Sequence, residues 1–118
     1  MLKSKNILIA IDNGIIGLDI KKQLNEYGYN AEIINLISKE KIRETLNRGF
    51  QLMILERSAN TEGLEYAVTL AREYNLPTIY LSTDTDTKNM YADGFRILMM
   101  PFGEDDLKEI VNLVLGDK

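Results

Sequence analysis

The chain has 118 residues, close to the commonest size of a single domain, and we expect one domain spanning residues 1–118. Its net charge of −4 argues against binding to nucleic acid or to an anionic membrane, because both are polyanions. The chain lacks cysteine and histidine, which excludes disulfides, thiolate chemistry and imidazole ligands. No apolar run is long enough to cross a bilayer, and we therefore expect a cytoplasmic protein.

The first half of the chain predicts two strands, each followed by a helix. Residues 7–11 are apolar throughout, as expected for a strand covered on both faces, and residues 31–37 form the second strand. The first helix has a stripe at spacings of three and four, made of Ile16, Ile20, Leu24 and Tyr27. Gly28 takes the usual position of a left-handed cap. Ser38 can cap the second helix, which stops at Gly49. Its inward positions are Ile42 and Leu46.

The second half predicts three more strands, at residues 52–55, 78–81 and 97–100. Asn60 or Thr61 can cap the helix between the first two of these strands. The buried stripe of that helix is expected at Leu64, Ala67, Val68, Ala71 and Tyr74. Residues 75–77 end it, and residues 83–92 predict a weaker, polar helix. The last helix opens with acidic residues at 104–106, which suit the positive end of a helix dipole. Its packing stripe is Leu107, Ile110, Val111 and Val114.

This alternation of strands and helices predicts an α/β protein with a flavodoxin-like (βα)5 fold. Right-handed crossovers place helices on both faces of the sheet if the strand order reverses once, which gives a three-layer sandwich. The order 2-1-3-4-5 has its switch point between the first and third strands. Asp12 and Glu56, which follow or close those two strands, are then expected beside each other.

The carboxyl ends of the predicted strands carry the chemistry of the chain. The residues gathered there are an acid at Asp12, an acid at Glu56, a hydroxyl at Ser82, and Met100 followed by Pro101. Open α/β sheets keep their binding sites at this edge. The set resembles a phosphotransfer pocket whose main reactive groups have been replaced.

Four sequence stretches carry a resemblance to a known family: 6–13 (NILIAIDN), 18–24 (LDIKKQL), 76–82 (LPTIYLS) and 101–107 (PFGEDDL). Together they resemble the receiver (response-regulator) domains of two-component signalling, over residues 5–115. The opening helix and the strand at 76–82 look most like receivers placed ahead of sensor domains in methanogen-type histidine kinases.

The resemblance implies a role for each residue of the pocket. A working receiver has two adjacent acids where Ile11 and Asp12 stand here, and the second of them ligates magnesium. Glu56 takes the position of the phosphoacceptor Asp. Ser82 keeps the hydroxyl that bonds a phosphoryl oxygen, whereas Met100 replaces the lysine that precedes the Pro-Phe pair.

These replacements predict a pseudo-receiver that is not phosphorylated on an Asp and is not an enzyme. Glu has one methylene more than Asp, which moves its carboxylate by roughly 1.5 Å, whereas attack geometry tolerates little more than about 1 Å. Met100 cannot neutralise a phosphoryl group. The alternatives are a phosphoacceptor with an atypical magnesium-dependent site, or a flavodoxin-like module that binds a small ligand. The ligand-binding alternative is disfavoured, because residues 12–17 do not have the G-x-G-x-x-G spacing of a phosphate-binding loop.

Each pocket residue also has a plainer interpretation. Glu56 could imitate the phosphorylated state or be an ordinary solvated carboxylate. Asp12 could bind magnesium weakly together with Glu56, or it could simply cap the first helix. Ser82 suits a strand end, Met100 suits a gap in the core, and Pro101 suits a tight turn. We expect no required cofactor.

The expected interaction face lies near the last strand, where receivers usually meet their partners. Its candidate residues are Tyr91, Phe95, Arg96 and Ile97. Aromatic and arginine side chains are good interface anchors. The resemblance implies a signalling protein as partner, such as a histidine kinase or an attached sensor or output domain. A second copy of the chain is a further candidate.

Overall fold

The computed structural model describes residues 5–11, 14–34, 39–56, 61–82, 95–100 and 102–115. These residues form one parallel sheet in the order β2-β1-β3-β4-β5, which confirms the predicted flavodoxin-like topology. The strands are β1 (Asn6–Ala10), β2 (Asn30–Ile34), β3 (Leu52–Glu56), β4 (Thr78–Ser82) and β5 (Arg96–Met99). The helices are α1 (Gly14–Glu26), α2 (Lys39–Leu46), α3 (Thr61–Glu73) and α5 (Glu104–Leu115). None of the helices in these ranges is long and apolar enough to span a bilayer.

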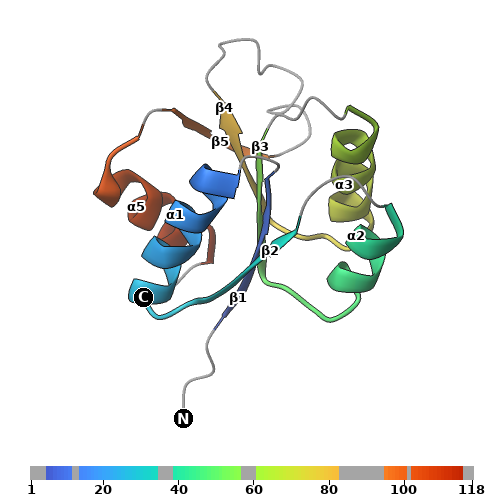
Figure 1. The fold of residues 1–118 in the computed structure, drawn as a ribbon, viewed down its shortest axis with the longest axis horizontal. Helices are drawn as coiled ribbons and strands as arrows, with labels where there is room; N and C mark the ends of the chain where they lie inside the picture. Colours follow the sequence, from blue (N-terminus) through green and yellow to red (C-terminus); the bar gives the residue numbers. More distant parts are fainter. Residues whose placement is uncertain are drawn as a thin grey trace.

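Two helical layers cover the sheet. Figure 1 shows α1 and α5 on one face and α2 and α3 on the other. Alternate residues of β1 enter the two resulting cores: Ile7 and Ile9 pack on the α1/α5 side, and Leu8 and Ala10 on the α2/α3 side. All four are fully buried. Burial on both faces explains why this strand has no polar-apolar alternation.

The first helix ends as predicted, in a left-handed glycine. Gly28 has a φ of 97°, and its amide donates to the carbonyl of Asn25 at 3.1 Å. The next amide, of Tyr29, donates to the carbonyl of Leu24 at 3.0 Å. These two bonds define a Schellman cap, and the side chains of Tyr29 and Leu24 complete it by packing in one core.

The next two helices also end in a left-handed residue. Gly49 follows α2 with a φ of 91°, and Asn75 follows α3 with a φ of 51°. At the end of α3 the amide of Leu76 donates to the carbonyl of Ala71 at 2.9 Å, which is the longer bond of the same cap. The predicted stops at Gly49 and at residues 75–77 are therefore confirmed.

Some details differ from the sequence-based expectation. Tyr74 was expected on the buried stripe of α3, but it is 38% exposed, and its hydroxyl donates to Asn47 Oδ1 at 2.6 Å. The helix ends at Glu73, and Leu70 is the fully buried residue in that turn. The predicted caps at Ser38 and Asn60, the end of the second strand at 35–37 and the helix at 83–92 lie outside the described residues.

We expect the substitution Gly28→Ala to lower the free energy of unfolding by about 1 kcal/mol. A Cβ at Gly28 would meet no atom within 4 Å, so the loss comes from the left-handed backbone alone. Urea unfolding of the two proteins measures it.

The matched control is Gly14→Ala, because Gly14 is also open to an added Cβ but has no positive φ. This variant should stay within about 0.5 kcal/mol of the parent or exceed it. Equal effects at the two glycines would contradict a specific role for the left-handed cap.

Candidate functional site

The carboxyl ends of the central strands bring the predicted site residues to one edge of the sheet, toward the top of Figure 1. The register there pairs Ala10 with Leu55, Glu56 with Leu81, and Ser82 with Met99. Glu56 and Ser82 therefore end neighbouring strands with an offset of one residue. Ile11, the residue after β1, lies next to the end of β3 in the same register.

Ser82 holds the last strand in place through its main chain. Its carbonyl accepts a hydrogen bond from the amide of Met100 at 2.8 Å. Ser82 is only 3% exposed, whereas Glu56 at the neighbouring strand end is half-buried. A buried hydroxyl and a partly solvated carboxylate thus lie on adjacent strands, as expected for a receiver-like pocket.

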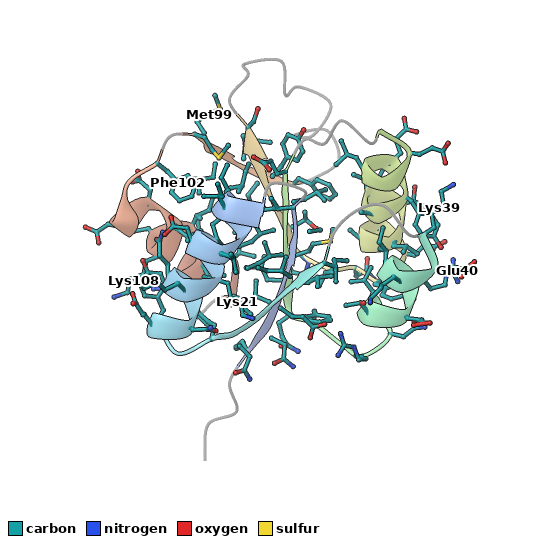
Figure 2. All side chains as sticks on the ribbon, viewed as in Figure 1. Lys21, Lys39, Glu40, Met99, Phe102 and Lys108 are labelled. Carbon is teal, nitrogen blue, oxygen red and sulfur yellow. The ribbon has the colours of Figure 1, made fainter. Side chains whose placement is uncertain are left out.

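Met100 belongs to the apolar packing of the edge. Its side chain is half-buried and packs against the core on the α1/α5 side, together with Leu98 and Phe102. Figure 2 shows Phe102 on that side of the sheet. The resemblance predicts a lysine ammonium at the position of Met100. A thioether cannot supply its charge.

Ile11 is part of the core as well. It is 2% exposed, it packs among the buried residues of the α1/α5 side, and its amide donates to the carbonyl of Ile34 at 3.3 Å. A working receiver is expected to have an acid at this position. A buried hydrocarbon side chain thus stands where the resemblance implies a carboxylate that would support a magnesium ion.

Lys39, at the start of α2, does not take the place of the positive charge that Met100 lacks, because it pairs with an acidic residue of its own layer. Lys39 Nζ lies 3.2 Å from Glu62 Oε2 on α3, and 5.7 Å from the centre of the Tyr66 ring. Figure 2 shows Lys39 on the layer opposite to α1 and α5. Within the described ranges, no three acidic, histidine or cysteine residues gather in a group that could hold a metal ion.

Three predicted residues lie outside the described part of the chain: Asp12, Pro101 and Tyr91. The proposed magnesium pair of Asp12 and Glu56 therefore stays a prediction. The pocket residues that the structure does place at one edge are Glu56, Ser82 and Met100.

The expected interaction face needs one correction. Phe95 is only 7% exposed and packs in the core on the α2/α3 side, where its ring lies in the same cluster as Leu76 and Tyr80. It is therefore not available as a surface anchor. Arg96 is exposed and Ile97 is half-buried against the same core.

Comparison with solved structures identifies the architecture. The chain superimposes on the response regulator receiver protein of Burkholderia phymatum with a TM-score of 0.81 and 19% identity, covering 96% of each chain. The match to the chemotaxis protein CheY4 of Vibrio cholerae has a TM-score of 0.79 and 19% identity, and it covers 95% of this chain and 99% of that one. The match to the receiver domain of Francisella response regulator 1452 has a TM-score of 0.78 and 20% identity, and it covers 96% of this chain and 98% of that one.

The chain has the receiver-domain fold of response regulators. No protein-family model and no curated protein matches the sequence itself. At these identities the structural likeness establishes the fold. The function of this receiver-like domain must be argued from its own residues.

We expect Ile11→Asp to lower the free energy of unfolding by about 3 kcal/mol or more, because it places a carboxylate in an apolar core. The conservative variant Ile11→Val should cost only about 1 kcal/mol. Urea unfolding measures both. A loss below about 0.5 kcal/mol for Ile11→Asp would mean that position 11 is open to solvent, as the acid of a working receiver would be.

Proposed function

We propose that this receiver-like domain is a pseudo-receiver of two-component signalling, which binds a protein partner without being phosphorylated. The observation that carries the proposal is the packing of Ile11 and Met100. Both take positions where the family resemblance implies charged groups, and both side chains pack against the α1/α5 core.

The chemistry of phosphoryl transfer supports this proposal. Transfer to a carboxylate needs in-line geometry, a magnesium ion and a cation that neutralises the moving phosphoryl group. Met100 offers no charge, and Ile11 offers no metal ligand. The longer side chain of Glu56 displaces its carboxylate by roughly 1.5 Å relative to that of an Asp, whereas the attack geometry tolerates a displacement of only about 1 Å. Three separate requirements of the reaction are therefore weakened at one edge.

The partner is proposed to be a signalling protein, either a separate histidine kinase or an attached sensor or output domain. One structural match supports the second arrangement. NtrX from Brucella abortus matches 97% of this chain with a TM-score of 0.81, but the match spans only 26% of that protein. There the receiver-like fold is one part of a longer chain. We further propose that the domain works in the cytoplasm and requires no cofactor.

A second candidate is a phosphoacceptor that uses Glu56. The adjacent strand ends of Glu56 and Ser82 favour it, because a hydroxyl beside the acceptor could bond a phosphoryl oxygen. One experiment separates the two candidates.

We expect no phosphoryl adduct on the parent protein after incubation with acetyl phosphate and magnesium, as read by intact mass spectrometry. The variant carrying both Glu56→Asp and Met100→Lys should gain a magnesium-dependent adduct, because it restores the acceptor length and the cation while Asp12 stays as the predicted magnesium ligand. A phosphorylatable receiver domain treated in parallel shows that the reagent is active.

The matched control combines Glu56→Asp with Met99→Lys, which adds the same charge one residue earlier on an exposed side chain. This control should stay unmodified. A stable adduct on the parent protein that disappears in Glu56→Gln would overturn the pseudo-receiver and establish the second candidate.

A further inference from the structure

The layer formed by α1 and α5 exposes large apolar side chains. On α1, Ile15 is 83% exposed and Leu18 is 64% exposed, and their spacing of three residues places them on one face of the helix. On α5, Leu113 is 61% exposed. A lone exposed leucine needs no explanation, but a pair of exposed apolar residues on one face of α1, and a third on the neighbouring helix, mark surfaces that can bind a partner.

Lysine side chains adjoin the apolar residues of α1. Lys21 and Lys22 line one depression with Leu18, Asn25 and Glu26, so that two ammonium groups and one carboxylate border it, and Figure 2 labels Lys21 on this helix. We call Ile15, Leu18, Lys21 and Lys22 the α1 stripe. The nearby Asp19 carboxylate accepts a hydrogen bond from Gln23 Nε2 at 3.1 Å. The stripe therefore combines apolar side chains with two positive charges.

A groove between β5 and α5 has the opposite character. We call it the β5–α5 groove; its lining residues are Leu98, Asp106, Glu109, Ile110 and Leu113. Three of these side chains are aliphatic and two are carboxylates. Lys108 of the same helix lies 5.5 Å from the centre of the Tyr27 ring, where it contacts the end of α1. The groove thus suits an apolar surface with positive charges.

We propose that the occupant of the β5–α5 groove is the α1 stripe of a second copy of this chain. Leu18 would contact Leu113 and Ile110, which removes apolar surface of both copies from water. Lys22 would lie near Glu109, so that opposite charges fix the register of the contact.

The position of the two surfaces makes this contact reciprocal. α1 and α5 are packed in one layer, where the Tyr29 hydroxyl donates to Asn112 Oδ1 at 2.6 Å and the two helices share a core. Figure 1 shows them side by side on one face of the sheet. In the proposed dimer, a two-fold axis that brings the stripe of one copy onto the groove of the second also brings the second stripe onto the first groove, so the assembly closes at two copies. None of the described phosphoacceptor-edge residues takes part, so the dimer does not depend on the proposed function.

The test is analytical ultracentrifugation, which measures the mass of the protein in solution over a series of protein concentrations. We expect the mass to rise from 13.5 kDa toward twice that value and to stop there. Lys22→Glu and Glu109→Lys should each raise the dissociation constant by roughly fivefold or more. Glu44→Lys on α2 makes the same charge change as Glu109→Lys, on the opposite layer, and should leave the constant unchanged.

A mixture of the two charge variants tests the proposed contact most directly. A one-to-one mixture of the Lys22→Glu and Glu109→Lys proteins should dimerise as well as the parent, because each contact then pairs opposite charges again. Leu18→Ser and Leu113→Ser should each weaken the dimer about tenfold or more. Circular dichroism of each variant checks that the fold is retained.

Three results would overturn the proposal: a monomer at every concentration, a dimer that Leu18→Ser and Leu113→Ser leave unchanged, or a mixture no tighter than its two components. A different protein that binds the α1 stripe while the chain stays monomeric would count against the second copy as occupant.

Discussion

The parallel pairing of β1 with β3 is the constraint on which the candidate site depends. This pairing forms the switch point of the sheet, and it aligns the end of the buried apolar run of β1 with the end of the strand that closes on Glu56. In a parallel sheet every strand delivers its last residue to the same edge. Residues far apart in the sequence, such as Ile11, Glu56 and Ser82, therefore meet whatever their chemistry. The fold supplies a meeting point, and the side chains determine what can happen there.

At this meeting point the chain has apolar packing at two positions where the family resemblance implies charged groups. Ile11 and Met100 both contribute to the core between the sheet and the α1/α5 layer. A buried carboxylate or a partly buried ammonium costs desolvation, which binding of a metal ion or a phosphoryl group would have to offset. Apolar side chains avoid that cost, and under the proposed function they leave phosphoryl transfer without a metal ligand and a cation. The two residues on which the proposed pseudo-receiver depends thus also contribute to the packing of the core.

The sequence predicted the fold more securely than the surface. Strand order and helix stops follow from local signals: a continuous apolar run for β1, and a left-handed residue at Gly28. Exposure of a single residue depends on neighbours that are distant in the sequence. Phe95 stands before an apolar strand and was expected on the surface, but its ring fills the core on the α2/α3 side. Conversely, the exposure of Leu18 can be predicted from the sequence, because Leu18 lies off the apolar stripe that marks the buried face of its helix. The pairing of Asp12 with Glu56 stays a prediction.

The three left-handed caps have a consequence for how such a domain can diverge. Gly28, Gly49 and Asn75 follow the ends of α1, α2 and α3, where the chain turns toward the next strand. These turns lie at the amino edge of the sheet, opposite to the edge that carries Glu56 and Ser82. Mutations that erase a reactive group therefore leave the turns that hold the helices in register untouched. The chemistry of the carboxyl edge can therefore change by substitution while the turns that fix the architecture stay as they are.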